Sequence, residues 1–208
     1  MPSIHLPERC GVMLLPDCTL FPQGGLPLYI FENRYRKMLE EALEGDCFFA
    51  VARLLREEVD FSEAAAAVGT IGLVRASREQ SDGSSQLLLH GVMRVRFLEW
   101  LDGKDYPYAR IEPVISEFTP PHQEKAAIAT LRGAVEDAIR TLPEAVRQNV
   151  LSVLDRADSA ALLTDIVSQQ FIHDPDLRQH LLELEQVGDR IPLICEYLRK
   201  AGAATQEE

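Results

Sequence analysis

The sequence predicts an α+β protein in which about six β-strands, with one early helix among them, are followed by an all-α helical bundle. Two features of the pattern support this prediction. Up to residue 118 the chain reads as short apolar or alternating runs separated by turn residues, which is typical of strands. After the rigid Thr119-Pro120-Pro121 segment, strand patterns nearly vanish and apolar residues recur at helical spacing. We therefore predict a sheet domain over residues 1–118 and a helical domain over residues 119–208.

The first two strands are predicted from short apolar runs near the start of the chain. Residues 12–15 form the first run, which ends in the turn residues Pro16 and Asp17. Residues 26–31 form the second, in which Pro27 lies near the start, where a missing amide donor does least harm to a sheet. The FPQGG loop between the two runs, residues 21–25, contains two glycines, and either can adopt a positive φ.

One amphipathic helix is predicted directly after the second strand. Apolar residues recur at the i, i+3, i+4, i+7 and i+8 positions of a helix, and Gly45 follows as a C-terminal cap. The expected inner face consists of Tyr35, Met38, Leu39, Ala42 and Leu43, and the expected outer face of Arg36, Lys37, Glu40 and Glu41. Because the rest of the domain must cover the inner face, we expect this helix to organise the sheet.

The remaining strands are predicted over residues 47–55, 68–76, 86–100 and 106–115. The first of these is continuously apolar apart from Arg53, as in a strand buried on both faces. The next two flank an Asp-Gly turn and predict an antiparallel hairpin, which Gly91 interrupts as a bulge or a close backbone crossing would require. Short strands around one helix predict a small, irregular barrel or half-barrel.

Five short helices are predicted in the second domain, and each has a start signal or a helical period of its own. The signals include Asp158 or Ser159 as the cap of the third helix, Asp174 before Pro175 for the fourth, and Pro192, which only a first turn tolerates, in the fifth. The apolar period of the first helix runs from Ile128 to Leu142. Five such helices with brief links predict a compact bundle.

The segment PLYIFENRYRKM, from Pro27 to Met38, resembles the opening signature of the Lon-protease N-terminal (substrate-binding) domain family. Asn33 stands where a proline is common in that signature, and the helix start survives this change because Asn33 or Glu32 can complement the free amides. Three further segments are similar to the family in the same order: LLLHGVMRVR from Leu87, LTDIV from Leu163 and RQHLLE from Arg178.

The resemblance covers nearly the whole chain, and it implies more than the residue patterns do. It implies a six-stranded, PUA-like pseudobarrel with a helical bundle, used to bind substrate or partner proteins. In full-length Lon proteases such a domain precedes an ATPase module and a protease module. We therefore expect a stand-alone member of this family.

We expect no catalysis and no cofactor in this chain. No G-x-x-x-x-G-K-[ST] segment is present, since the Gly103-Lys104 pair is followed by Asp105, and there is no G-x-S-x-G elbow. The alternative is an unrecognised hydrolase. The four cysteines form no C-x-x-C pair and suit a reducing compartment, and we interpret Cys47 and Cys195 as small core residues.

A metal site is not predicted. His173, Asp176 and His180 could gather near one helix start and bind a metal weakly, but such spacings arise often by chance, so we interpret them as a solvated helix end. No apolar run is long enough to span a bilayer, and the first residues lack the regions of a signal peptide. We therefore expect no membrane association and a cytoplasmic location.

The charge balance argues against nucleic acid as a partner. The formal net charge is −12, with 12 Lys and Arg against 18 Asp and Glu in residues 1–118 and 9 against 15 in residues 119–208. The alternative is a PUA-like RNA-binding protein that uses Arg94, Arg96 and Arg110 as a phosphate-binding stripe. We favour the interpretation that these arginines form ion pairs with acidic neighbours. The candidate neighbours are Glu32, Glu99 and Glu112.

The function that remains is a non-catalytic module or adaptor that binds unfolded or partner polypeptides, and a separate ATP-dependent protease is a candidate partner. Such binding needs an accessible apolar or amphipathic surface. The candidate residues lie in the loop before the second strand and on the polar face of the helix: Phe21, Pro22, Asn33, Arg36, Lys37, Glu40 and Glu41. Two alternatives remain open, namely that Phe21 is a core residue and that the helix face is merely solvated.

Overall fold

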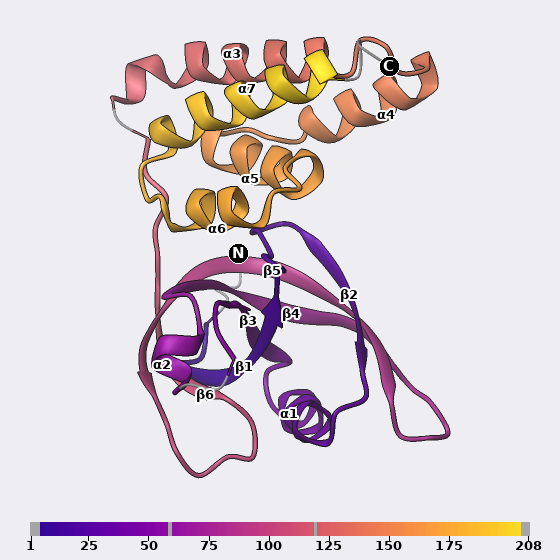
Figure 1. Cartoon of the computed structure of the whole chain (residues 1–208), viewed down its shortest axis with the longest axis vertical. Coiled ribbons are helices and arrows are strands. Elements are labelled where there is room, and N and C mark those ends of the chain that lie inside the picture. The colour runs from indigo at the N-terminus through magenta and orange to yellow at the C-terminus, as the bar shows by residue number, and fades with distance from the viewer. Residues whose placement is uncertain (1–4, 58–59, 119, 205–208) are drawn as a thin grey trace. The chain divides into compact units, whose positions relative to one another are not determined.

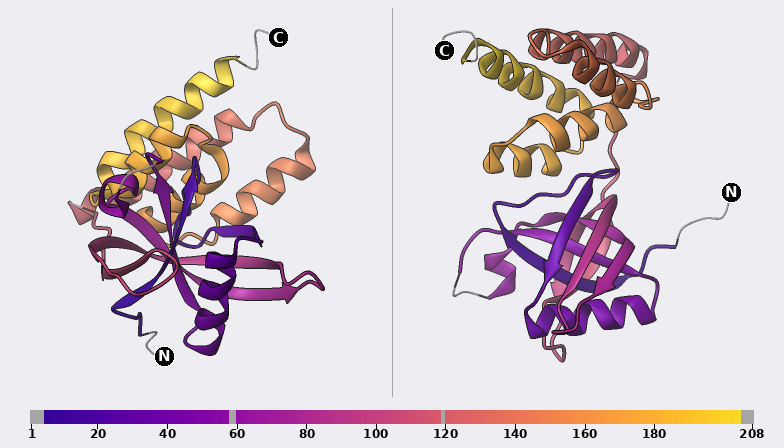
Figure 2. Two further views of the ribbon diagram at one scale, coloured as in Figure 1. Left: turned by 60° about the horizontal axis from the view of Figure 1, so that its bottom comes forward. Right: turned by 90° about the vertical axis from the view of Figure 1, so that its right-hand side faces the viewer.

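The computed structural model describes residues 5–57, 60–118 and 120–204. The chain divides into two compact units, Met1–Val114 and Ile115–Glu208 (Figure 1). The strands belong to the first unit, and a set of helices forms the second (Figure 2). Thr119, where we predicted the domain boundary, lies outside the described residues.

The first unit, called the sheet unit below, is built on one mixed six-stranded sheet in the order β2-β5-β4-β3-β1-β6. β1 and β3 run parallel, and the other neighbouring pairs are antiparallel. β6 also pairs with β5, so the sheet curls, but it is not a regular closed barrel, because β2 pairs with β5 alone. The strands are β1 Arg9–Pro16, β2 Gly25–Ile30, β3 Phe48–Leu54, β4 Val68–Glu79, β5 Ser85–Trp100 and β6 Tyr108–Pro113. The predicted α+β class is confirmed.

The early helix, α1 (Asn33–Glu44), is present as predicted and ends at Gly45, whose N–H donates to the carbonyls of Ala42 and Glu41. Its buried residues pack into one of two hydrophobic clusters of the sheet unit, together with residues of β3 and β5. The Tyr35 hydroxyl accepts a hydrogen bond from the Leu14 N–H at 3.2 Å, which ties α1 to β1. Burial raises the pKa of that hydroxyl.

Two predictions about glycine and burial in the sheet are confirmed. β3 is buried over most of its length, as its continuous apolar pattern requires. At Gly91 the ladder between β4 and β5 shifts register, and a Cβ atom at this position would overlap the Phe21 carbonyl oxygen. Gly91 is therefore both the bulge and the close backbone crossing that we considered.

The second unit contains the five predicted helices. They are α3 Glu124–Ala138, α4 Glu144–Leu154, α5 Ala160–Phe171, α6 Pro175–Glu183 and α7 Val187–Ala204. Of the two proposed caps for the third helix, Ser159 is the one used, since its hydroxyl accepts a hydrogen bond from the Leu162 N–H. Asp174 caps α6 through the Leu177 N–H at 2.7 Å. Leu142, which we assigned to the first helix, lies beyond its end and is 41% exposed.

Short additional elements were not predicted. α2 (Phe61–Ala64) follows β3, and a single 3-10 turn, η1 (Pro121–Gln123), precedes α3. The interior of the second unit includes a fully buried Arg190, whose guanidinium donates to the Leu184 carbonyl and to the Ser116 hydroxyl. The Asp165 carboxylate lies 3.5 Å from the same guanidinium, so the buried charge is paired.

Candidate functional site

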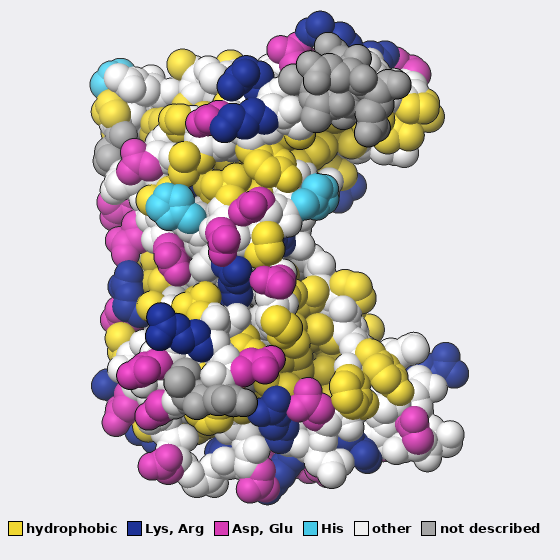
Figure 3. Space-filling view, viewed as in Figure 1, with side chains coloured by type: hydrophobic (Ala, Val, Ile, Leu, Met, Phe, Trp, Pro, Cys, Tyr) yellow, Lys and Arg dark blue, Asp and Glu magenta, His cyan; other side chains and the backbone are white. Residues whose placement is uncertain are grey.

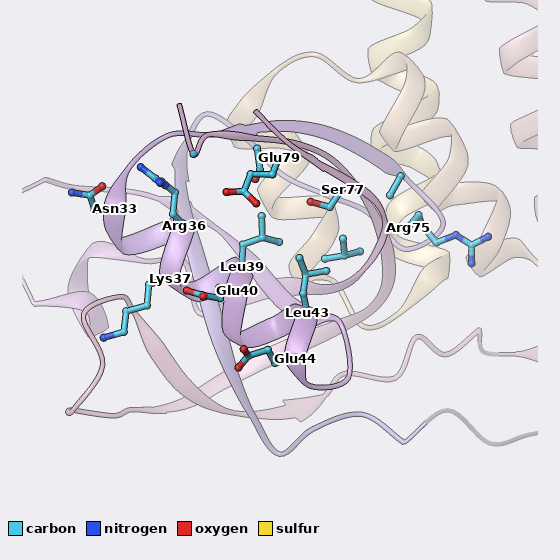
Figure 4. A pocket seen from close by; sticks show the side chains of 14 residues that line it. Asn33, Arg36, Lys37, Leu39, Glu40, Leu43, Glu44, Arg75, Ser77 and Glu79 are labelled. Atoms are coloured by element: carbon cyan, nitrogen blue, oxygen red, sulfur yellow. The ribbon is translucent and has the colours of Figure 1, made fainter. Parts of the chain in front are cut away.

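A groove of about 1,000 Å³ runs between the outer side of α1 and the second half of β4, and ends near the β4–β5 turn (Figure 4). Four of the seven candidate site residues line it. These four come from α1 and are Asn33, Arg36, Lys37 and Glu40. Because the groove lies wholly within the sheet unit, its walls are positioned by the core that α1 and the sheet share.

The floor of the groove is apolar. Leu39 and Leu43 extend from α1 toward β4, as Figure 4 shows, and Val74 of β4 lines the same space. Leu39 is only 4% exposed, but Leu43 is 44% exposed, although its helical spacing had placed it on the buried face. That prediction is wrong because the sheet covers only part of the inner face of α1, and the last turn faces the groove instead.

One end of the groove lies at the β4–β5 turn. The Arg36 guanidinium packs so closely on Gly83 that a Cβ atom there would overlap it, and Gly83 has a φ of 78°. Beside it, the Ser84 hydroxyl and N–H donate to the Asp82 carboxylate at 2.6 and 2.9 Å. These bonds lower the pKa of Asp82, and the positive charge of Arg36 contributes to the shift.

The charges on the rim are unequally paired. Lys37 donates to the Asp105 carboxylate at 2.6 Å, which raises the pKa of Lys37 and lowers the pKa of Asp105. Across the part of the chain that the structure describes, Glu40 and Glu44 take part in no ion pair. The groove therefore combines an apolar floor with carboxylates that remain available to a ligand.

Glu41, a further candidate, does not line the groove. Its carboxylate accepts hydrogen bonds from the Lys104 ammonium and from the Tyr106 hydroxyl, the latter at 2.7 Å. The bond from Lys104, followed by that from Tyr106, lowers the pKa of Glu41. Glu41 thus links α1 to the connection between β5 and β6 and has a structural role.

The two loop candidates also lie away from the groove. Phe21 is fully buried, and the Arg94 guanidinium lies 5.8 Å from the centre of its ring. Pro22 is half-buried in a turn held by the Gln23 N–H, which donates to the Gly91 carbonyl at 2.8 Å. Gln23, rather than either glycine, takes the positive φ of this loop, 64°. The suggestion that Phe21 offers an accessible surface is therefore wrong, and the alternative interpretation as a core residue is correct.

Sequence reasoning missed a second accessible surface, on the outer side of β2. Tyr29 and Phe31 are 53% and 63% exposed, and their rings stack with centroids 5.9 Å apart. Leu88 of β5, which pairs with Pro27, is 43% exposed. Figure 3 shows hydrophobic side chains gathered over this side of the sheet unit. The signal was the period of two in β2, which turns Pro27, Tyr29 and Phe31 outward and Leu26, Leu28 and Ile30 inward.

The arginines of β5 and β6 do not form the phosphate-binding stripe that we considered. Arg94 is 2% exposed, while Arg96 pairs with Glu112 and Arg110 with Glu99, each at 3.3 Å. The ion-pair interpretation is correct for these last two residues. Charges already matched in this way offer little to a phosphate backbone.

The cysteines differ in part from our prediction. Cys47 and Cys195 are half-buried rather than core residues, and Cys10 is the buried one. Burial raises the pKa of Cys10 to about 12, so its thiol is protonated at neutral pH and is a poor nucleophile. Among the described residues, no three His, Cys, Asp or Glu side chains gather as a metal site would require, and no helix is long and apolar enough to cross a membrane.

Residues 9–200 match the family model described as "ATP-dependent protease La (LON) substrate-binding domain". The chain belongs to this family. The Lon protease of Geobacter metallireducens is 23% identical over 203 residues, which cover 95% of this chain and 24% of that protein. Lon protease 2 of Herpetosiphon aurantiacus is 29% identical over 190 residues, which cover 86% of this chain and 22% of that protein. The chain therefore spans about a quarter of the length of the curated relatives it matches.

Solved structures of the Lon substrate-binding family share the fold. The N-terminal domain of a Mycobacterium avium complex Lon protease matches with a TM-score of 0.74 at 13% identity, and covers 92% of this chain and 98% of that one. A Lon N-terminal domain protein from Xanthomonas campestris matches with a TM-score of 0.62 at 18% identity, and covers 89% and 96%. The predicted resemblance is confirmed, and with it the six-stranded α+β architecture.

Proposed function

We propose that this chain is a non-catalytic module that binds unfolded or partner polypeptides in the groove between α1 and β4, without ATPase or protease activity of its own. The observation that carries the proposal is the exposed apolar floor of that groove, Leu43 above all, in a chain of the Lon substrate-binding family. An exposed apolar floor rimmed by charged residues is typical of a binding groove, because another molecule can cover it.

The chemistry of the groove suits a polypeptide better than a small metabolite. Its volume of about 1,000 Å³ is at the upper end of small-molecule sites, and charged side chains line it beside the apolar floor (Figure 4). Apolar side chains of a bound segment would cover Leu43 and Val74, and polar or charged side chains would reach the rim. The exposed Tyr29 and Phe31 offer a second apolar contact for a long unfolded chain.

We further propose that the module acts as an adaptor that delivers bound polypeptides to a separate ATP-dependent protease. The relatives it matches are Lon proteases, of which this chain spans only the substrate-binding part. A degradation assay with a Lon-type protease tests this step. Addition of the chain is expected to raise the rate at which an unfolded polypeptide is degraded, and an unchanged rate would contradict the adaptor role alone.

Fluorescence anisotropy with labelled, reduced and carboxamidomethylated ribonuclease A, a basic unfolded polypeptide, tests binding directly. The unfolded probe should bind and the native protein should not. Leu43→Asp should weaken binding by about tenfold, because it places a charge on the apolar floor. Leu142→Asp is the matched control, since Leu142 is similarly exposed, at 41%, but belongs to the helical unit, so binding should be retained.

The outcomes of this titration separate the parts of the proposal. If the unfolded probe does not bind, polypeptide binding itself is refuted. If it binds equally well to the wild-type chain and to Leu43→Asp, the groove is not the binding site. Release of phosphate from ATP, or cleavage of the probe by the purified chain, would refute the non-catalytic assignment.

A further inference from the structure

β4 is paired on both edges over only its first half. Its ladder with β5 runs the whole length of the strand, from Val68 to Glu79. Its ladder with β3 ends at Leu73, and the last bond to that side is the Val74 N–H donating to the Cys47 carbonyl at 2.9 Å. From residue 75 onward, the second edge of β4 has no strand partner among the described residues.

The direction of the free backbone groups follows from the turn. The Gln80 N–H donates to the Ser84 carbonyl at 2.8 Å and thus points toward β5. Because successive residues of a strand direct their backbone groups to opposite edges, those of Ser77 and Glu79 point to the edge away from β5. The register shift between Val74 and Ala76 brings the Val74 N–H to this same edge.

This free edge lies in the groove. Ser77 and Glu79 line it together with Val74, and α1 forms the opposite wall. Figure 4 shows Ser77 and Glu79 on β4, with Leu39 and Leu43 extending from α1 toward that strand. A row of backbone donors and acceptors therefore stands beside the apolar floor of the groove.

We propose that polypeptides bind here by β-strand addition: an extended segment forms a further strand on the free edge of β4, between β4 and α1, with basic side chains facing Glu40 and Glu44. This inference rests on the proposed function and specifies its mode and its substrate class. Main-chain hydrogen bonds accept many sequences, as a module for unfolded chains requires, and the rim selects among them by charge.

The charges favour a basic segment over a second copy of this chain. Three carboxylates that line the groove have no ion pair among the described residues: Glu40, Glu44 and Glu79. Of the cations that line it, Lys37 is matched by Asp105 and the charge of Arg36 acts on the Asp82 carboxylate, so Arg75 alone offsets these carboxylates. The chain has a formal net charge of −12, so a second copy would bring further negative charge to an acidic rim. A segment rich in lysine or arginine is attracted to the same rim.

Backbone methylation of a peptide tests strand addition without changing the protein. The probe is a fluorescein-labelled peptide of alternating valine and lysine, compared with one version N-methylated at each valine and another N-methylated at each lysine. In an added strand, alternate residues turn their N–H groups to the same edge. One methylated version should therefore lose about tenfold or more in affinity while the other binds like the parent. Equal binding of both, or equal loss, overturns strand addition.

Hydrogen exchange locates the added strand. The amides of Ser77 and Glu79 should exchange rapidly in the free protein and slowly with the valine-lysine peptide bound. Tyr29 is the internal control, because it lies two residues after Pro27 and its N–H is expected on the outer edge of β2. Protection at Tyr29 instead of at Ser77 and Glu79 would place the peptide on β2 and overturn the inference.

Charge reversal tests the selection of basic segments. The Glu40→Lys, Glu44→Lys double variant should weaken binding of the valine-lysine peptide by about tenfold. The Asp102→Lys, Glu136→Lys variant has the same net charge at exposed sites outside the groove and should bind like wild type. Equal losses in both variants would show attraction to the net charge only, and would overturn the assignment to Glu40 and Glu44.

The titration with carboxamidomethylated ribonuclease A separates this inference from the function on which it rests. If that probe binds but neither methylation nor Ser77 protection responds, the chain binds polypeptides by another mode. If neither that probe nor the peptide binds, the proposed function itself fails. A dimer that protects Ser77 and Glu79 without peptide, detected by analytical ultracentrifugation, would show that a second copy occupies the edge and would overturn the inference.

Discussion

The two halves of β4 have the same neighbour on one edge and different neighbours on the other. Residues 68–73 (VGTIGL) lie between β5 and β3 and are buried almost throughout. Residues 74–79 (VRASRE) lie between β5 and the groove and are mostly exposed. The first half needs small residues, since a Cβ atom at Gly72 would lie 2.5 Å from the Leu89 side chain. The comparison teaches that one strand can belong to the core over one half and present a free edge over the other, where its pairing with the neighbouring strand stops.

The largest expected effect on stability concerns α1, which likewise has a buried part and a part that faces the groove. Leu39 is buried, so Leu39→Asp places a charge in the core without a partner and should lower the free energy of unfolding by about 4 kcal/mol. Leu43, one turn further, faces the groove, and Leu43→Asp should change that free energy by less than about 0.5 kcal/mol. Urea denaturation measures both. Similar losses in the two variants would show that the groove is closed.

A smaller effect distinguishes the two halves of β4 directly. Gly69→Ala should lower the free energy of unfolding by about 3 kcal/mol, because the new Cβ would overlap the Val51 carbonyl oxygen and lie 2.9 Å from the Phe97 ring. Ser77→Ala in the second half should change it by less than about 0.5 kcal/mol. Thermal and urea unfolding of the two variants provides the test. An unchanged free energy of unfolding in Gly69→Ala would contradict the tight packing of the first half of β4.

The pH dependence of stability distinguishes Glu41, whose carboxylate accepts hydrogen bonds from Lys104 and Tyr106, from the neighbouring Glu40 on α1. The Glu41 pKa lies below its usual 4.5 in the folded protein, so the folded state releases this proton more readily than the unfolded one. The resulting stabilisation is fully present above about pH 4.5 and is lost as the pH falls through the lowered pKa. Since the side chain is one-third exposed, we expect less than about 1 kcal/mol.

Two variants make this measurable by thermal melting from about pH 7 to about pH 3. Glu41→Gln should melt with a shallower dependence on pH in the acid range than wild type, because it lacks the titrating group. Glu40→Gln is the matched control on the same helix, since Glu40 has no ion-pair partner in the described parts of the chain. If both variants behave alike, the bonds from Lys104 and Tyr106 do not stabilise the fold.

The smallest effect is expected at Lys37. This side chain and its partner Asp105 are 50% and 73% exposed, so Lys37→Glu removes a solvated ion pair and should leave the melting temperature nearly unchanged. A large drop would show that this face of α1 is buried, and would remove the outer wall of the groove. Circular dichroism of the variant is sufficient to decide.

The candidate site was only partly predictable. The helical period placed Arg36, Lys37 and Glu40 on one accessible face of α1, and the groove is lined by that face. The same period gave no means of separating Glu41, which bonds to residues more than sixty positions along the chain. Phe21 was left between core and surface for the same reason, since its burial depends on the distant crossing at Gly91.

By itself, the sequence determined the elements: the early helix, the hairpin around the Asp-Gly turn, the five later helices and the family signature from Pro27 to Met38. Such features depend on the local spacing of residues, so they can be predicted from a single sequence. Only the tertiary structure decided that β3 begins at Phe48, opposite Leu73 of β4, and so that the edge of β4 beyond Leu73 faces a groove. Strand pairing joins residues distant in sequence, and a local pattern records which face is apolar without recording what covers it.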